Sequence, residues 1–398
     1  MTERLYYLDS YCRLFDATVA RSCDHEGRPA VTLDRTAFYP TSGGQPFDVG
    51  RLGTARVLET VDVDEDVVHV LSAPLEPNVA VTGEIDWSRR FDHMQQHTGQ
   101  HLLSAAFDRL FDNRTVGFHM GAEVSTIDLA RESVSADIER AVDEANRVVW
   151  EDHPVSVRFV AQEEAATLPL RKESAREGTL RLVEIAGFDL SACGGTHVSR
   201  TGAVGMIAVL AWERLRGGSR VTFACGNRTL GALRVYRDAV SGCVRTLSVV
   251  PADLPSAVER VQTESRDLRK EVKGLREQLA EYEGVRLAAS ATDVHGVGVV
   301  TETVVGWDAG ALKRLATAVT ANRPVCAVLL SPGPPVSIVV ACSAGVAVDA
   351  RAVLQQLVGQ FGGKGGGKRE MAQGGGLTGS AEVIASTARA ALESMLSP

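Results

Sequence analysis

Two short pairs of residues in this chain could together hold a metal ion. His97 and His101 lie four residues apart, so on a helix their side chains share one face, one turn apart. Cys193 and His197 form the second pair, and the two glycines between them indicate a loop. The first pair alone is equally typical of ordinary helical histidines. Three imidazoles and a thiolate, however, are a donor set that zinc prefers, so both pairs together predict a zinc site.

The residues around the first pair predict the helix that such a site needs. Leu102, Leu103 and Leu110 supply an apolar periodicity that continues to Phe111, and Asp92 is a candidate N-cap. The other elements expected between residues 91 and 227 are a hairpin of 116–121 and 124–129, a helix over 137–150, strands over 155–161 and 180–185, and a hairpin of 205–212 and 219–225. We therefore expect an α+β domain whose site lies between a helix and a loop.

Composition limits the kinds of protein that this chain can be. Its 398 residues suggest two to four domains, and 42 Lys and Arg against 50 Asp and Glu leave a net charge of −8. Nucleic acid would therefore have to bind at local basic patches. The seven cysteines form no CxxC pair and fit a reducing cytosol better than a disulfide framework. With no signal-like or membrane-spanning apolar run, the expected location is the cytoplasm, away from membranes.

Residues 1–90 are expected to form a small β-barrel, because short alternating strands are separated by turn residues. Within this region the sequence Ser-Gly-Gly-Gln occupies positions 42–45. Gly43 and Gly44 are typical of a turn with positive φ, which is the simpler interpretation. They would also let the backbone approach a ligand, with the Gln45 amide as donor and acceptor.

A helical linker is predicted for residues 228–290, because apolar residues repeat every seven positions over 254–282. This seam could pack against the helix of residues 228–247 or join two copies of the chain in a homodimer. Residues 291–398 then alternate strands and helices, which predicts a small α/β domain.

The glycine-rich segment, residues 362–376, is expected to be a long loop in that last domain. Its residues 362–368 match the G-x-x-x-x-G-K pattern of a nucleotide P-loop, but Arg369 replaces the Ser or Thr that binds magnesium, and a helix precedes it. Lys364, Lys368 and Arg369 could instead hold the phosphates of a nucleic acid. A flexible lid or linker is the plainer alternative.

Four motifs resemble those of alanyl-tRNA synthetases. The editing domain of these enzymes is similar at HTGQHLL (97–103), CGGTHV (193–198) and SGGQP (42–46), and their C-terminal domain, which is related to that of DHH phosphoesterases, is similar at GGKGGGKREMAQGGG (362–376). The motifs occur in that family's order, and no aminoacylation domain precedes them in this sequence. The chain therefore resembles the long form of the freestanding alanyl-tRNA editing proteins, AlaX.

The resemblance implies a hydrolase that deacylates mischarged tRNA(Ala), chiefly seryl-tRNA(Ala), with glycyl-tRNA(Ala) as a second candidate substrate. It implies that His97, His101, Cys193 and His197 bind zinc and that residues 291–398 bind tRNA. The alternatives are an editing domain of the threonyl type, a DHH-type phosphoesterase, and a non-catalytic RNA-binding protein with a structural zinc. Neither a general base nor an open position on the metal follows from the sequence.

Selectivity for serine over alanine requires a polar group in the site. Alanine lies between glycine and serine in size, so a pocket that admits serine excludes alanine only by recognising the serine hydroxyl. The candidates near the predicted helix are Thr36, Gln45, Thr98, Ser125 and Thr126. Of these we favour Gln45 and Thr126 as substrate-binding residues, with Gly43 and Gly44 beside them.

Overall fold

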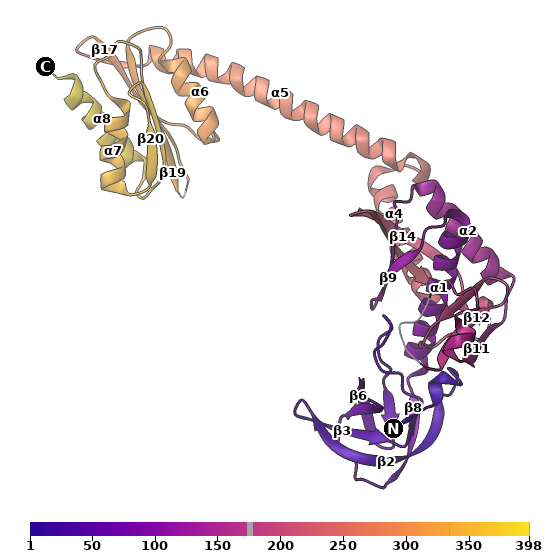
Figure 1. Cartoon of the computed structure of the whole chain (residues 1–398). Coiled ribbons are helices and arrows are strands. Elements are labelled where there is room, and N and C mark those ends of the chain that lie inside the picture. Colours follow the sequence, from indigo (N-terminus) through magenta and orange to yellow (C-terminus); the bar gives the residue numbers. More distant parts are fainter. Residues whose placement is uncertain (173–177, 334, 398) are drawn as a thin grey trace. The chain divides into compact units, whose positions relative to one another are not determined.

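The computed structural model describes residues 1–172, 178–333 and 335–397 and divides the chain into two compact units, Met1–Cys243 and Val244–Pro398 (Figure 1). Each unit combines helices and sheets, which confirms the predicted mixed α+β multidomain organisation. None of the helices within the described ranges combines the length and apolar composition that a membrane crossing needs.

The first unit begins with six antiparallel strands that close into a barrel in the order β2-β3-β7-β6-β5-β8. Their bounds are β2 Leu14–His25, β3 Arg28–Leu33, β5 Gly50–Leu52, β6 Ala55–Val63, β7 Asp66–Leu71 and β8 Ala80–Ile85. Side chains alternate along these strands, so that Phe15, Ala17 and Val19 of β2 are buried and their neighbours face outward. Two shorter strands, β1 Glu3–Arg4 and β4 Arg35–Thr36, pair beside the barrel.

Helix α1, Trp87–Phe111, follows the barrel and carries the first histidine pair. It begins earlier than predicted, because the Asp86 carboxylate, and not Asp92, accepts a hydrogen bond from the Arg89 N–H at 3.1 Å and caps the helix. Asp92 lies within the helix and forms an ion pair with Arg228, 2.6 Å between Oδ2 and Nη2. The prediction of an Asp92 cap is therefore wrong.

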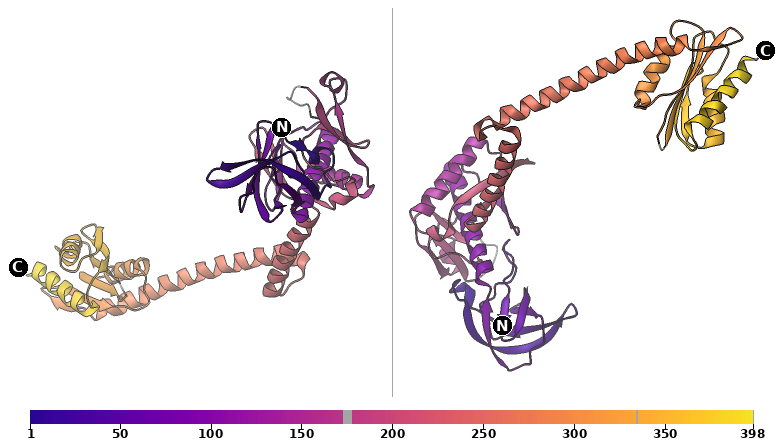
Figure 2. Two further views of the ribbon diagram at one scale, coloured as in Figure 1. Left: turned by 90° about the horizontal axis from the view of Figure 1, so that it is seen from below. Right: turned by 180° about the vertical axis from the view of Figure 1, so that it is seen from behind.

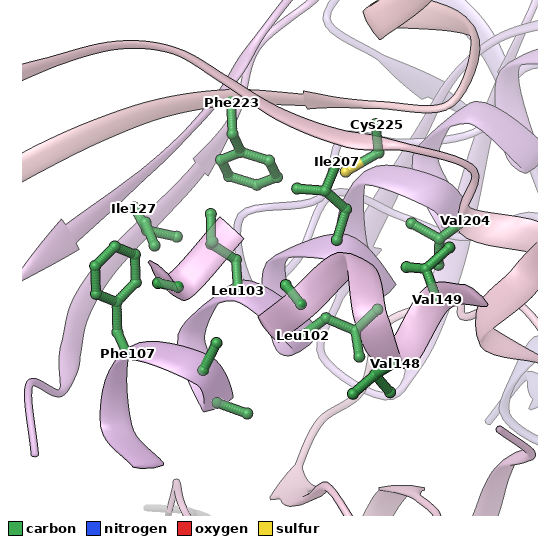
Figure 3. Packing of buried hydrophobic residues seen from close by; sticks show 14 of the residues in the cluster. Leu102, Leu103, Phe107, Ile127, Val148, Val149, Val204, Ile207, Phe223 and Cys225 are labelled. Atoms are coloured by element: carbon green, nitrogen blue, oxygen red, sulfur yellow. The ribbon is translucent and has the colours of Figure 1, made fainter. Parts of the chain in front are cut away.

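A four-stranded sheet and helix α2 enclose α1. The sheet has the order β14-β15-β10-β9, from β9 Thr115–Met120, β10 Ser125–Leu129, β14 Ile207–Leu215 and β15 Gly218–Cys225, and α2 spans Ser135–Trp150. Leu102, Leu103 and Phe107 of α1 pack with Ile127, Phe223 and Val148 from these elements (Figure 3). This core holds α1 on several sides, so the histidines lie on a helix with little freedom to move.

A second, three-stranded sheet positions the other pair. It consists of β11 Val155–Val160, β12 Leu180–Ile185 and β13 Asp189–Ala192, all antiparallel, with the short helices α3 Gln162–Ala165 and η2 Thr201–Val204 nearby in the chain. Strand β13 was not predicted. The chain leaves it directly into the loop of Cys193 and His197, so the sheet sets where that loop begins.

A buried ion pair joins the barrel to α1. Arg90 is fully buried and its guanidinium bonds to the Asp48 carboxylate and to the carbonyls of Ser10 and Ala37. The same Asp48 oxygen accepts the backbone N–H of Tyr39 at 2.7 Å. A buried guanidinium is tolerated only when its donors are satisfied, so the barrel and the helix are built to fit each other.

Two helices follow the first domains along the chain, α4 Asn227–Leu247 and, after the turn η3 Pro251–Asp253, the long α5 Leu254–Ala289. The helical character predicted for this stretch is confirmed. Within its own unit, α5 packs on α6 near its C-terminal end, where Ala280, Gly284 and Leu287 are buried. The heptad seam before that point, including Leu268 and Leu275, is exposed.

The second unit contains a six-stranded sheet in the order β16-β17-β18-β19-β21-β20. Its elements are β16 Thr292–Val294, β17 Val297–Thr303, α6 Ala309–Val319, β18 Val325–Ser331, β19 Val336–Cys342, α7 Ala350–Phe361, β20 Lys364–Gly367, β21 Met371–Leu377 and α8 Ala381–Leu396. Helices α7 and α8 cover one face, and α6 covers the other (Figure 2). Each face of the sheet packs into its own hydrophobic core, and successive residues of β18 point to opposite faces. Val328 packs with α7 and α8, and Leu329 packs with α6.

The glycine-rich segment is a β-hairpin, so the prediction of a long loop is wrong. Strand β20 pairs with β21, with Lys364 opposite Gly375, and β21 pairs with β19, with Ala372 opposite Val340. Without this hairpin, the backbone groups on one edge of β19 would be unpaired. The hairpin pairs them, and its glycines let its two strands approach with little side-chain hindrance. At Gly367 an added Cβ would lie 2.3 Å from the Met371 carbonyl oxygen, which only glycine avoids.

Candidate metal centre

The His/Cys cluster consists of His97, His101, Cys193 and His197, and the fold brings all four together. One ligand atom from each lies within 4.8 Å of the others. The Cys193 sulfur is 3.4 Å from His97 Nε2 and 3.3 Å from His197 Nε2. A sulfur and a nitrogen on one tetrahedral zinc, bound at about 2.3 and 2.0 Å, lie about 3.5 Å apart. The cluster therefore has the donor types and the spacing that a metal ion requires.

The turn of residues 42–45, between β4 and β5, orients the first of the three rings. Gln45 Oε1 accepts the Thr196 backbone N–H at 3.1 Å, and Gln45 Nε2 donates to the Thr196 hydroxyl at 2.8 Å. The amide orientation is thereby fixed, and the same Oε1 faces His97 Nδ1 at 2.8 Å. Nδ1 must then carry the proton, which leaves the Nε2 lone pair directed to the cluster. Gln45 is thus a positioning residue for His97.

Asp189 on β13 orients the second ring. Its Oδ2 accepts from His101 Nδ1 at 2.8 Å, while Arg171 donates to both carboxylate oxygens, Nε at 2.6 Å and Nη2 at 3.0 Å. Burial raises the pKa of Asp189, but the bonds to His101 and Arg171 outweigh it and hold the pKa well below its usual value. This carboxylate–histidine pair is typical of metal sites, and the sequence analysis missed it.

The third ring is held by a residue of α1 itself. Thr98 Oγ1 lies 3.2 Å from His197 Nδ1 and accepts the Val198 backbone N–H at 3.2 Å. Burial lowers the pKa of His197 to about 3, so this ring is neutral at physiological pH. Burial raises the pKa of the Cys193 thiol, but the His97 and His197 rings outweigh it and hold that pKa well below normal. Neutral imidazoles and a thiolate are the forms that bind metals.

The loop between Cys193 and His197 is rigid because of one glycine and one arginine. A Cβ at Gly195 would lie 2.1 Å from His97 Cε1, so only glycine lets the loop approach the ring. Arg181 Nη1 donates to the carbonyls of Cys193 at 2.7 Å and Gly195 at 3.0 Å, and its Nε donates to the Tyr7 carbonyl at 3.0 Å. Arg181 is another residue that the sequence analysis missed.

A cavity of about 580 Å³ opens onto the cluster from the side of His97, His101 and Cys193. Its wall comes from the barrel region, from α1, from β9 and from the second sheet, and it includes Tyr7, Tyr39, Ser42, Gly43, Gln100, Thr115, Phe118, Phe159, Lys172 and Arg181. A volume of this size suits an organic ligand rather than a few waters. A ligand in this cavity would lie next to His97, His101 and Cys193.

Only part of the predicted substrate-binding set lies at this cavity. Gly43 lines it, and Gly44 follows in the turn, with φ values of 58° and 86°. The Thr36 hydroxyl is fully buried in the barrel region and bonds to His69 Nε2 at 2.8 Å. Thr126 lies on β10 between His119 and Thr222 of the adjoining strands. Neither threonine is among the described residues that line the cavity.

The three cations predicted to bind tRNA lie on the glycine-rich hairpin and are all exposed. Lys364 begins β20, whereas Lys368 and Arg369 occupy the turn before β21. Four residues of extended strand span about 13 Å, so the hairpin spreads these charges along its length. Lys364 also lines a hollow of about 410 Å³ between the hairpin and α6.

Comparison with known proteins identifies the family. The chain is 32% identical to "Alanyl-tRNA editing protein AlaX-L" of Pyrococcus horikoshii, over 94% of this chain and 94% of that protein. The chain belongs to the AlaX family of alanyl-tRNA editing proteins. This AlaX-type chain is also 32% identical to the alanine–tRNA ligase of Pyrococcus abyssi and 34% identical to that of Methanothrix thermoacetophila, in each case over 94% of the chain and 42% of the ligase.

Two domain families match parts of this AlaX-type chain. The "Threonyl and Alanyl tRNA synthetase second additional domain" matches residues 180–221, which include Cys193 and His197, and the DHHA1 domain matches residues 296–394. A solved C-Ala domain of the Aquifex aeolicus alanyl-tRNA synthetase is 22% identical over 27% of the chain and 99% of that domain, with a TM-score of 0.25. The family resemblance seen in the motifs is confirmed.

Proposed function

We propose that the protein is a hydrolase that deacylates mischarged tRNA(Ala), chiefly seryl-tRNA(Ala), with glycyl-tRNA(Ala) as a slower substrate. The observation that carries this proposal is the His/Cys cluster at the wall of a cavity in a chain of the AlaX family. An aminoacyl ester is already activated, so its hydrolysis needs little more than orientation, polarisation and a water molecule. The reaction belongs to the cytoplasm, where tRNAs are charged.

Zinc is the metal that best fits the cluster. Three imidazole nitrogens and one thiolate match its preference for N and S ligands, and the 3.3 and 3.4 Å separations match a tetrahedral site. When bound there, zinc would supply Lewis-acid chemistry next to the ester. His97, His101, Cys193 and His197 would hold it, with the partial exposure of Cys193 on the cavity side giving the substrate its approach.

The surrounding residues would keep the site in one geometry. Gln45 and Asp189 fix the tautomers of His97 and His101, so the Nε2 atoms present lone pairs without rearrangement. Gly195 and Arg181 hold the loop close against His97. Because these contacts are all internal, the protein would present a preorganised site to the tRNA end.

Gln100 is the best candidate for recognising the serine hydroxyl. It lies on α1 directly before His101, lines the cavity and donates from Nε2 to Ser104 Oγ at 2.8 Å. Within the described residues its Oε1 accepts no hydrogen bond, so that oxygen is free for a substrate hydroxyl. By contrast, Gln45 Oε1 already faces two donors, Thr196 and His97. An alanyl group has no hydroxyl and would leave the Gln100 oxygen unpaired. Hydrolysis of correctly charged alanyl-tRNA(Ala) would therefore be disfavoured.

The second unit would supply tRNA affinity. The chain has a net charge of −8, so phosphate binding depends on local cations such as Lys364, Lys368 and Arg369.

The exposed heptad seam of α5, over residues 254–282, supports a homodimer that forms through this helix. Light scattering tests this: Leu268→Glu with Leu275→Glu should halve the mass of a dimer, and an unchanged mass would exclude this seam.

One experiment separates this function from its rivals. Deacylation of seryl-tRNA(Ala) and seryl-tRNA(Thr) is measured with and without a chelator. We expect rapid loss of the seryl group from tRNA(Ala) only, abolished by the chelator and restored by zinc. Preference for tRNA(Thr) would indicate threonyl-type editing, and no deacylation of either tRNA would favour a non-catalytic zinc protein or a phosphoesterase.

A further inference from the structure

One row of residues runs across the three-stranded sheet from solvent to the His/Cys cluster. Phe159 of β11 lies directly opposite Arg181 of β12. The Cys193 backbone N–H in turn donates to the Arg181 carbonyl at 3.1 Å, so Cys193 continues the row beyond β13. All three residues line the cavity. Residues that lie opposite each other in an antiparallel pair share one face, so an aromatic ring, a cation and a metal ligand stand side by side.

Phe159, at the solvent end of this row, is a large apolar residue with an unusually exposed side chain. It is 45% exposed, whereas its neighbour Val160 points to the other face and is buried with Leu180 and Leu182. A large exposed aromatic ring at the mouth of a cavity gives up few protein contacts when a flat ligand binds, and it gains a stacking partner. The other rings of the cavity already have ring partners, Phe118 with His97, and Tyr7 and Tyr39 with Tyr6. Among the described residues Phe159 has none, so it is the ring left free.

The charge of the cavity narrows the class of ligand. Its charged lining residues outside the cluster are Arg171, Lys172 and Arg181, and no carboxylate side chain lines it among the described residues. Arg171 is neutralised by Asp189, but Lys172 is exposed and forms no ion pair within the described parts of the chain. In a chain of net charge −8, a cavity whose described charged lining residues outside the cluster are all cations favours an anionic ligand.

A neighbouring hollow shows which way such a ligand cannot extend. It shares Tyr7 and Phe159 with the cavity, but its wall carries the carboxylates of Glu3, Asp62, Asp64 and Glu65 against one cationic side chain, Arg4, which pairs with Asp62. Phosphates entering there would meet several carboxylates. Lys172 therefore marks the side on which an anionic chain leaves the cavity.

We propose that Phe159 is a stacking platform for the terminal adenine of the tRNA, with Lys172 facing the phosphate that precedes this nucleoside. Neighbouring strands lie about 4.8 Å apart, so Phe159 and Cys193 are about 10 Å apart along the row. A ring and a reactive ester separated by one ribose fit that span. The subsite rests on the proposed function, because the ester at the cluster belongs to the same nucleoside as the stacked base.

The test uses the full-length, metal-loaded chain and two measurements. The first is the affinity for the dinucleotide cytidylyl-adenosine, which carries the terminal base and the phosphate that precedes it but no aminoacyl ester. The second is the KM and kcat for seryl-tRNA(Ala). In Phe159→Ala we expect dinucleotide affinity to fall roughly 5- to 150-fold, the range for one stacked base, with KM raised and kcat nearly unchanged. Phe159→Tyr should restore both, because it keeps the aromatic face.

Trp212→Ala is the matched control. Trp212 is also an aromatic residue on a strand, β14, and is 44% exposed, but it does not line the cavity. The Trp212→Ala variant should bind the dinucleotide as the wild type does. Metal content and melting temperature verify the fold of every variant. Dinucleotide affinity and KM that are unchanged in Phe159→Ala, or no dinucleotide binding by the wild type, would overturn the subsite.

The two proposals fail in different ways. A wild type that binds the dinucleotide through Phe159 but hydrolyses no aminoacyl-tRNA would refute the proposed function and keep the nucleotide subsite. A wild type that hydrolyses seryl-tRNA(Ala) with a KM that is indifferent to Phe159 would keep the function and refute the subsite.

Discussion

The His/Cys cluster and the glycine-rich hairpin are both built from conspicuous sequence motifs, yet they are opposite kinds of structure. The histidine rings of the cluster are buried, and each has a fixed Nδ1 partner. The hairpin is an edge of a sheet, and its residues 362–370 are exposed. A site that holds a metal needs neighbours on all sides, whereas one that holds a phosphate chain needs only accessible charge. Single substitutions should therefore have large effects at the cluster and small, additive ones at the hairpin.

The largest expected effect follows from removing a ligand. Cys193→Ala or His97→Ala should reduce zinc from about one ion per chain to nearly none and lower kcat/KM for seryl-tRNA(Ala) by more than about 100-fold. Metal analysis of the purified variants and a deacylation assay measure this. Full zinc occupancy in both variants would disprove the site as described.

A smaller effect is expected from the residues that orient the rings. Gln45→Leu and Asp189→Asn should each weaken zinc binding by roughly 10- to 100-fold, because the His97 or His101 ring loses the partner that fixes its tautomer. Competition with a zinc-binding dye measures the affinity. Gln95→Leu is the control, since Gln95 is a similarly buried glutamine of α1 that bonds to the Ala203 carbonyl. Equal losses in all three variants would point to general damage of α1.

Selectivity should depend on one oxygen of the cavity wall. Gln100→Leu removes the proposed hydroxyl acceptor, and the ratio of kcat/KM for seryl-tRNA(Ala) over alanyl-tRNA(Ala) should fall by about tenfold. The measurement compares charged tRNAs under single-turnover conditions, with glycyl-tRNA(Ala) as a third substrate. A ratio that stays at the wild-type value would clear Gln100 of this role.

The hairpin should show the opposite behaviour. Replacing Lys364, Lys368 and Arg369 together by alanine should raise KM a few-fold and reduce the salt dependence of binding by about one unit per lost phosphate contact. Zinc content and kcat should not change, because the cluster lies in the other unit.

The control for this variant removes an equal charge elsewhere. Arg266, Arg269 and Lys270 are exposed on α5, so their triple alanine variant changes the net charge by the same amount. An identical change of KM and salt slope in both triple variants would mean that net charge, and not the hairpin, determines tRNA binding.

The last effect concerns stability rather than activity and involves a buried histidine that has no part in the cluster. Burial lowers the pKa of His69 to about 4, while the unfolded chain titrates near 6.5, so the unfolded state binds more protons between these pH values. Stability from this residue is present above pH 6.5 and is lost as the pH falls toward 4, by about 2–3 kcal/mol. Urea unfolding of the wild type and His69→Asn at several pH values should show a shallower decline in the variant. If the unfolding free energies of the wild type and the variant fell in parallel with pH, the loss of stability would not come from His69.

The metal ligands could be predicted from the sequence, because each pair is local. A spacing of four residues on a helix and a short glycine loop confine two ligands each without knowledge of the fold. Their partners are not local: Gln45 lies 52 residues from His97, and Asp189 lies 88 residues from His101. Only the fold brings them together. A carboxylate four residues before Cys193 was the one available signal for Asp189.

The errors have a common physical cause. Asp92 has the chemistry of an N-cap, but a partly buried ion pair with Arg228 uses its carboxylate, and Asp86 caps the helix instead. Likewise, the glycines of residues 362–376 favour a loop by local propensity, but backbone pairing with β19 holds this segment in two strands. Thr36 has a hydroxyl near the turn of Gly43, yet that hydroxyl is used inside the barrel. In each case a tertiary contact outweighs a local preference.

The bond between Gln45 and Thr196 has a consequence for heat denaturation. Gln45, in the turn that leads from β4 to barrel strand β5, holds both the loop of the second pair and the ring of His97, although the barrel supplies no ligand. A ligand that binds only the folded state raises the unfolding free energy of everything that must fold with its site. Metal uptake should therefore protect the barrel from melting, and a chelator should lower the melting temperature reported by Phe15 and Phe38, two rings buried in its interior.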